Sequence, residues 1–236
     1  MTTSGNDEQR QRLIAIVSIL VVILSLVVIF RPKRSPSSRI AKVSNQLHTA
    51  IGEVAAEQTL ALLGRSPKVI VISVEPAPSE FAAATAELAG FMKIAKLRGG
   101  LTVVAVEHVN AEEFRRVMST ANFGFSAERY SRLLEKYPGV DGIVSFVGGP
   151  LLTEEQAQSL PEKLPKFVAV QGMGFGGNLR RLFENKVIQV AITPRHDVSS
   201  AGAKEPKTGR EVFDRHYQVI TADGWEKGNF FEENSA

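Results

Sequence analysis

The longest apolar run of the sequence extends from Leu13 to Phe30, contains no charge, and has Ser18 and Ser25 as its only polar residues. A helix rises about 1.5 Å per residue, so this run spans roughly 27 Å, close to the thickness of the hydrocarbon core of a bilayer. It lacks the polar stripe of a surface helix and the small-residue cleavage site of a signal peptide. The pattern predicts a single transmembrane helix whose partner is the lipid bilayer.

The charges that flank this run predict its orientation. Two Lys or Arg residues precede it and five follow it, within 31–42. Because positive flanks are retained inside, the larger C-terminal part is expected in the cytoplasm, with the extracytoplasmic side as the alternative. The same basic cluster suits anionic lipid head groups.

The location of the charges argues against a nucleic-acid partner. The whole chain carries a net charge of +3, but residues 1–42 hold seven Lys or Arg and two Asp or Glu. Residues 43–236 therefore hold 21 basic and 23 acidic residues, a net charge of −2. A duplex-binding surface needs an excess of positive charge that this part lacks. Cysteine is absent, which excludes disulfides and thiolate chemistry.

Composition and turn residues divide the chain into consecutive segments. About 190 residues follow the apolar run, enough for one sizeable domain. The helix that precedes the first strand is expected either to pack as an extra layer or to stand as a stalk above the membrane. The predicted segments are an N-terminal tail (1–12), a transmembrane helix (13–30), a basic linker (31–39), a connecting helix (40–64), an α/β domain (65–222) and a C-terminal tail (223–236) in which Trp225 is a candidate docking contact.

Short apolar runs alternate with helical patterns after the connecting helix. The runs are rich in Val and Ile and are bounded by Gly and Pro, which is typical of strands buried on both faces. The predicted fold class is α/β, an open, mostly parallel sheet with helices on both faces (flavodoxin/Rossmann-like), preceded by one N-terminal transmembrane helix. The predicted strands are 68–73, 101–107, 140–147, 166–171, 186–193 and 216–221.

Ligands of open α/β sheets bind beyond the carboxyl ends of the strands, so the residues that follow each strand are the candidate ligand-binding residues. They are polar or glycine-rich, although loops in general favour such residues. The candidates are Ser73, Glu75, Glu107, His108, Gly148, Gly149, Gly172, Gly174, Gly177, Asn178 and Arg195.

The glycine loop has two interpretations. Gly172, Gly174 and Gly177 match the G-x-G-x-x-G pattern after a strand and before a short helix, and Asp197 lies near the spacing of a ribose-binding acid. The motif follows the fourth strand rather than the first, and its helix is short. A tight loop that lets backbones pack closely is therefore favoured over dinucleotide binding.

No catalytic constellation is recognisable, so no catalytic residue, metal site or cofactor is predicted. The chain has no Gly-x-Ser-x-Gly elbow. Glu107, His108, His196 and Asp197 could converge at the strand ends, but they have no local metal-ligand spacing. The sequence favours a domain that is not an enzyme, without excluding one.

Two segments carry a family resemblance. The sequence Gly139-Val140-Asp141-Gly142-Ile143-Val144 resembles a strand of type I periplasmic-binding-protein and sugar-repressor domains, and 164–170 resembles their next strand. The resemblance covers residues 68–193 and implies a single lobe. Those families use two lobes that close on a ligand, so the resemblance implies a fold and carries no site residues over.

The sequence therefore predicts a membrane-anchored, non-catalytic domain that binds a small ligand or a protein partner at the carboxyl edge of the sheet. One alternative is a nucleotide-dependent enzyme that uses the Gly172–Gly177 loop. Another is a structural subunit of a membrane complex, whose partner would be a membrane protein.

Overall fold

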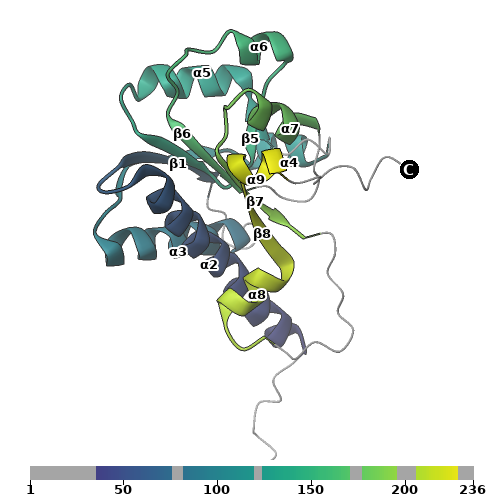
Figure 1. Ribbon diagram of the computed structural model, residues 1–236. Helices are drawn as coiled ribbons and strands as arrows, with labels where there is room; N and C mark the ends of the chain where they lie inside the picture. The colour runs from purple at the N-terminus through teal and green to yellow at the C-terminus, as the bar shows by residue number, and fades with distance from the viewer. Residues whose placement is uncertain (1–35, 76–81, 120–123, 171–176, 196–205, 228–236) are drawn as a thin grey trace, which may run out of the picture. The chain divides into compact units, whose positions relative to one another are not determined.

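A computed structural model describes residues 36–75, 82–119, 124–170, 177–195 and 206–227 (Figure 1). The chain divides into two compact units, Met1–Ile40 and Ala41–Ala236, and the second unit contains the sheets. The predicted transmembrane segment Leu13–Phe30 lies outside the described residues. Within the described ranges, no helix is both long and apolar enough to cross a membrane.

The main sheet has six strands in the order β2-β1-β4-β6-β7-β8. The first five are parallel and β8 runs antiparallel to β7, which confirms the predicted mostly parallel sheet. Strands β3 and β5 form a separate parallel pair. The strands are β1 (Lys68–Val74), β2 (Thr102–Val109), β3 (Gly124–Ser126), β4 (Gly142–Ser145), β5 (Gly149–Leu151), β6 (Lys166–Val170), β7 (Val190–Pro194) and β8 (Tyr217–Thr221).

Helices cover both faces of the main sheet, as predicted. Side chains of α2, α3 and α8 form one apolar cluster with alternate residues of the strands, and side chains of α5, α6 and α7 form the other (Figure 1). The helices are α2 (Pro36–Leu63), α3 (Ala82–Arg98), α4 (Ala111–Ser119), α5 (Ala127–Lys136), α6 (Glu154–Gln158), α7 (Gly177–Glu184), α8 (Gly209–His216) and α9 (Ala222–Lys227).

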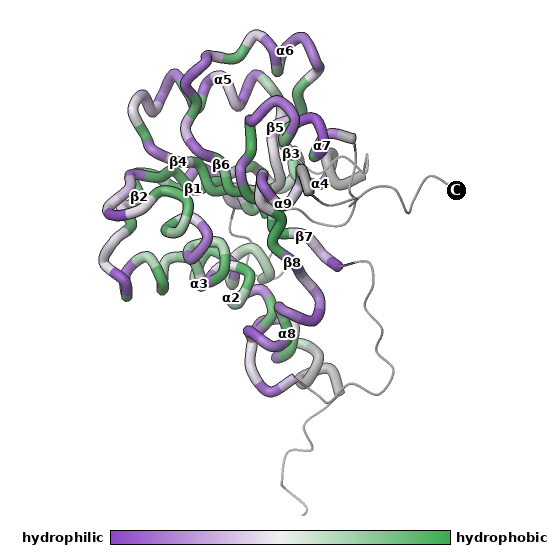
Figure 2. Tube along the Cα trace, viewed as in Figure 1, coloured by the Kyte–Doolittle hydropathy of each residue, from purple (hydrophilic) through white to green (hydrophobic). Residues whose placement is uncertain are grey.

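The central strands are buried on both faces because successive side chains point to opposite sides of the sheet. In β1, Val69 and Val71 belong to the cluster with α2 and α3, whereas Ile70 and Ile72 belong to the cluster with α5 and α7. Figure 2 shows β1, β4 and β6 as a hydrophobic centre. The continuous apolar runs of the sequence are thus explained by burial from two sides.

Helix α2 packs on the sheet as a layer from Ala50 onward. Its Ile51 and Ala55 are fully buried. Two glycines let α2 and α3 approach closely, because a Cβ on Gly52 would lie 1.9 Å from the Glu87 carbonyl oxygen and one on Gly90 would lie 2.1 Å from that of Thr49. The sequence did not decide whether this helix packs on the sheet or stands as a stalk. From Ala50 onward, the helix packs on the sheet.

Polar side chains cap the starts of three helices. The amide of Glu113 donates to the Asn110 side chain over 2.7 Å at the start of α4. Ser126 caps α5, and Thr153 with Gln156 forms a capping box at the start of α6. Gly64 ends α2 with a φ of 79°, the left-handed conformation that glycine adopts easily.

Some element boundaries were predicted wrongly. The expected strand 140–147 is shorter than predicted and forms only β4 at 142–145. A further short strand, β5, follows at 149–151 after Gly148, whose φ of 83° turns the chain. The expected strand 186–193 begins only at Val190, since Lys186 has a φ of 56°. Helix α9 forms at 222–227, across the start of the predicted C-terminal tail, and Trp225 stacks on Phe183 at 5.2 Å between ring centroids. Trp225 thus makes the docking contact that the sequence suggested.

Candidate functional site at the carboxyl edge of the sheet

The strand order places a topological switch between β1 and β4. The chain leaves β1 to form β2 on one side and later returns to form β4 on the other side. In open α/β sheets, ligands bind outside the carboxyl ends of the strands at such a switch. Ile72 lies beside Ser145 in the register, and the Phe146 amide donates to the Ile72 carbonyl over 2.9 Å. The candidate residues Ser73 and Glu75 therefore lie at this switch.

Two buried hydroxyl groups mark this edge. Ser73 in β1 and Thr193 in β7 are each only 1% exposed, and neither hydroxyl has a hydrogen-bond partner among the described residues. Strand alternation puts Ser73 on the face of α2 and α3, and Thr193 on the face of α7. A buried hydroxyl without a partner costs about 1–3 kcal/mol. Groups of this kind are suited to a ligand or an ordered water.

Ser145 and Thr193 were not among the predicted site residues. Ser145 is fully buried at the end of β4, and its Oγ accepts from the Val147 amide over 3.3 Å. The available signal is a hydroxyl at the end of an otherwise apolar strand. It is a weak signal, because Ser and Thr also end strands for local hydrogen bonding.

Glu75 and Gly148 lie next to the switch. Glu75 is exposed, and its amide donates to the Val109 carbonyl of β2 over 2.9 Å. Gly148 is buried, and its amide donates to the Val170 carbonyl at the end of β6 over 3.1 Å. Together with Ser73, these residues follow strands that are neighbours in the sheet.

Glu107, another candidate ligand-binding residue, forms hydrogen bonds with side chains at the end of α5. Its carboxylate accepts from Lys136 Nζ at 2.7 Å and from the Tyr137 hydroxyl. These hydrogen bonds lower the pKa of Glu107 against the opposing effect of burial. His108 is exposed on the border strand β2, and its carbonyl accepts from the Arg129 guanidinium. The described contacts of Glu107 are those of a residue that anchors a helix.

Three further candidate ligand-binding residues contact neighbouring parts of the fold. A Cβ on Gly149 would lie 2.5 Å from Leu182 Cδ1 of α7, so a larger residue here would require the Leu182 side chain to move. Asn178 Nδ2 donates to the Pro150 carbonyl over 3.2 Å. Arg195 Nε donates to the carbonyls of Asp214 and Tyr217 over 3.1 and 3.0 Å, which ties the end of β7 to α8 and β8.

The glycine loop is only partly described. Gly172 and Gly174 lie outside the described residues, and Gly177 is the first residue of α7. Asp197 and His196 also lie outside them. In the described part of the chain, no group of three or more His, Asp or Glu side chains is arranged to hold a metal ion.

The sequence matches no family model and no curated protein. Solved structures resemble it in fold. The solute-binding protein of an ABC transporter from Burkholderia graminis, in complex with D-arabinose, has a TM-score of 0.50 at 17% identity, with 75% of this chain and 60% of that chain covered. An arabinose-binding protein from Geobacillus stearothermophilus has a TM-score of 0.49 at 19% identity, over 76% and 62%.

The fold resemblance predicted from 139–144 and 164–170 is confirmed by the first of these structures. The chain spans about three-fifths of the length of the proteins it matches, 60% and 62%. This extent is compatible with the predicted likeness to a single lobe. Identity of this order establishes the fold and leaves the ligand to be argued from the site.

Proposed function

We propose that this chain is a membrane-anchored, non-catalytic domain that binds a small neutral ligand rich in hydroxyl groups at the carboxyl edge of its sheet. The observation that carries the proposal is the buried hydroxyl of Ser73, beside the switch between β1 and β4, which has no hydrogen-bond partner among the described residues. It can donate and accept hydrogen bonds with a ligand hydroxyl.

Three further observations support the proposal. The edge coincides with the topological switch between β1 and β4, where open α/β sheets bind ligands. The structure from Burkholderia graminis with the same fold holds D-arabinose. Within the described residues, the charged candidate Glu107 is already paired with Lys136, which suits a neutral ligand better than an ionic one.

The anchor is proposed from the sequence. Leu13–Phe30 is long and apolar enough to cross a bilayer, and five basic residues follow it at 31–42. The domain then lies on the cytoplasmic side. A reporter enzyme that is active only in the cytoplasm, fused after Ala236, tests this orientation. Activity of a periplasmic reporter at the same position would overturn it, and recovery of the chain without membranes would overturn the anchor.

Thermal unfolding of the full chain in dodecyl maltoside micelles tests the ligand class. A panel of neutral pentoses and hexoses that begins with D-arabinose is expected to raise the midpoint. A ligand at 100 times its Kd stabilises the folded state by about 2.7 kcal/mol. Ser73→Ala removes the hydroxyl at the switch and is expected to abolish the rise without destabilising the unliganded protein. Thr193→Val removes the buried hydroxyl on the other face, three strands away, and is expected to leave the rise unchanged.

Ser131→Ala is the matched control, because it removes an exposed hydroxyl on α5. It should leave the sugar-induced rise unchanged. Absence of a rise with every sugar, or a rise that survives Ser73→Ala, would count against the proposal. A rise with NAD or ATP alone would favour the nucleotide-dependent enzyme.

A further inference from the structure

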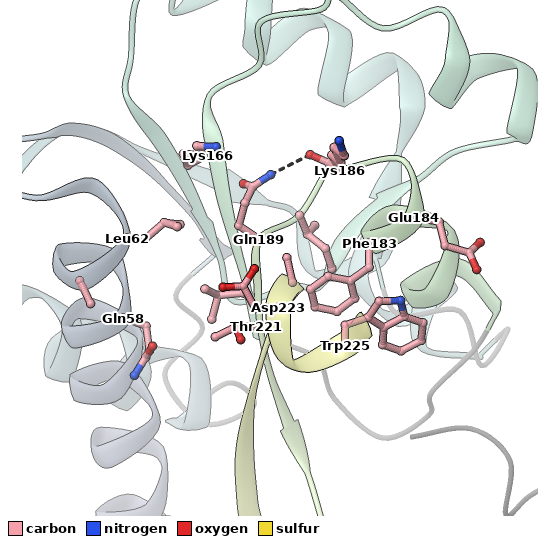
Figure 3. A pocket seen from close by; sticks show the side chains of 14 residues that line it. Gln58, Leu62, Lys166, Phe183, Glu184, Lys186, Gln189, Thr221, Asp223 and Trp225 are labelled. Carbon is pink, nitrogen blue, oxygen red and sulfur yellow. Dashed lines mark hydrogen bonds between the residues drawn. The ribbon is translucent and has the colours of Figure 1, made fainter. Parts of the chain in front are cut away.

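A cavity lies at the amino edge of the sheet, opposite the edge of Ser73 and Thr193. Its volume is about 690 Å³, within the range of roughly 300–1,000 Å³ that small-molecule sites occupy. Lys166 and Val190, the first residues of β6 and β7, form its floor together with Thr221, the last residue of β8. Helix α2 forms one wall, and α7 and α9 form the other (Figure 3).

The cavity has an apolar wall that ends in an aromatic stack. Leu62, Ile188 and Val190 contribute aliphatic side chains. The rings of Phe183 and Trp225 lie at 5.2 Å between centroids and 9° between planes. Aromatic surface of this kind binds the apolar body of a ligand with little conformational cost.

Two lysines supply unbalanced positive charge. Lys166 and Lys186 both line the cavity and are exposed, and neither forms an ion pair among the described residues. Figure 3 places both at the same end of the cavity. Of the acidic lining residues, Glu184 is already paired with Arg180 at 2.7 Å. Asp223 is then the remaining acidic group, so the unpaired charges leave an excess of one positive charge.

The backbone at Lys186 is unusual for a lysine. Its φ of 56° is the left-handed conformation that Gly or Asn normally supplies after a helix. Its carbonyl accepts from Gln189 Nε2 over 2.7 Å, which fixes the turn beside the cavity. A strained position occupied by a charged residue is a reason to seek a role for its side chain.

We infer that this amino-edge cavity binds a small organic anion, a carboxylate with an apolar body. The carboxylate lies between the Lys166 and Lys186 ammonium groups, and the body lies against Trp225 and Leu62. The carboxyl edge offers buried hydroxyl groups, whereas this cavity offers two lysines and an apolar wall. The two edges therefore select ligands of different chemistry.

Trp225 is the only tryptophan of the chain, so its fluorescence reports on this cavity alone. The probe is 3-phenylpropionate, added to the full chain in dodecyl maltoside with excitation that Trp225 absorbs and the probe does not. A saturable change in Trp225 emission is expected below about 5 mM. The neutral alcohol and the cationic amine with the same phenylpropyl body should each bind at least about tenfold more weakly.

The double variant Lys166→Gln, Lys186→Asn should weaken 3-phenylpropionate binding about tenfold, because both cations are lost. Asn suits the left-handed backbone at position 186, so this variant should fold normally. Asp223→Asn should strengthen binding, since it removes the repelling charge. Lys96→Gln, which removes an exposed charge on α3 outside the cavity, is the matched control and should change nothing.

Absence of a saturable emission change would overturn the inference. So would equal binding of the acid, the alcohol and the amine, or unchanged affinity in the double lysine variant. These outcomes are independent of sugar binding, because Ser73→Ala and Thr193→Val lie at the other edge and should leave the Trp225 response intact.

Discussion

The two faces of the main sheet are packed by different means. On the face of α2 and α3, small residues let backbones approach, and Gly52 and Gly90 lie where a Cβ would overlap a carbonyl oxygen. On the face of α5, three large rings fill the space, with Phe167 at 6.4 Å from Phe125 and 6.1 Å from Tyr130 between centroids. One face therefore depends on the absence of side-chain atoms and the other on their presence.

Each face also holds a glutamate with a shifted pKa, and the two shifts are in opposite directions. Burial of Glu87 on α3 raises its pKa, and the His48 ring nitrogen 2.7 Å away only partly offsets this. Hydrogen bonds from Lys136 and Tyr137 lower the pKa of Glu107. The faces thus differ in electrostatics as well as in packing, and the following predictions test the contrast.

Removal of a ring should have the largest effect. Phe167 is fully buried, so Phe167→Ala should lower the free energy of unfolding by about 3–5 kcal/mol through lost burial and the cavity left behind. Urea unfolding followed by circular dichroism measures this. Met92→Ala on α3, at a residue 40% exposed, is the control and should cost less than about 1 kcal/mol. A similar small cost for Phe167→Ala would show that the rings do not support their face.

Addition of one carbon to the other face should have the next largest effect. Gly90→Ala would place a Cβ 2.1 Å from the Thr49 carbonyl oxygen. The backbones must then separate, at a cost of about 1–3 kcal/mol that exceeds the gain in helix propensity of about 1 kcal/mol. Urea unfolding again measures the change.

The matched control for this substitution is Gly100→Ala. Its new Cβ would meet Leu60 Cδ2 at 3.5 Å, an ordinary contact. It should leave stability nearly unchanged. Equal stability of Gly90→Ala and the native chain would contradict close backbone packing between α2 and α3.

The smallest effects should be those of pH, with opposite sign on the two faces. The folded pKa of Glu87 lies above its usual value of 4.5, so its contribution to stability is present below pH 4.5 and is lost as pH rises through the folded pKa. Glu87→Gln should therefore gain stability relative to the native chain as pH rises from 4.5.

Glu107 should behave in the opposite way. Its folded pKa is depressed, so its contribution is present above the usual 4.5 and is lost as pH falls through the folded value. Glu107→Gln should lose stability relative to the native chain near neutral pH and recover it in acid. Unfolding curves of the three proteins at several pH values measure both trends. If the free energy of unfolding changed with pH in the same way in the native chain and in both variants, the opposite pKa shifts of Glu87 and Glu107 would be refuted.

Much of the domain could be predicted because its signals are local. The apolar strand runs, the capping residues Asn110, Ser126 and Thr153, and the final glycine Gly64 act within a few residues of themselves. The short strand β5 was missed, because Gly148 and Gly149 resemble any glycines in a turn after a strand. Its role depends on pairing between Gly149 and Gly124, which are distant in sequence.

The sequence could predict where the candidate site lies, at the carboxyl edge of the sheet, but not the contacts of its residues. Strand ends identified Ser73 and Glu75, because parallel strands bring their carboxyl ends together. The partner of Glu107 could not be predicted, since Lys136 reaches it only after α5 packs on the sheet. Ser145 and Thr193 are unusual because their hydroxyl groups are buried. The sequence pattern does not show whether a single hydroxyl is buried, so both residues were missed.

By itself, the sequence determined the apolar segment Leu13–Phe30, the alternation of the six main-sheet strands with helices, and the edge where strand ends meet. Periodicity and turn chemistry encode these features residue by residue. Only the tertiary structure decided the close approach of α2 and α3 and the amino-edge cavity. That cavity joins Gln58, Lys166 and Trp225, which are far apart in the chain and meet because β6, β7 and β8 pair and α2 packs beside them.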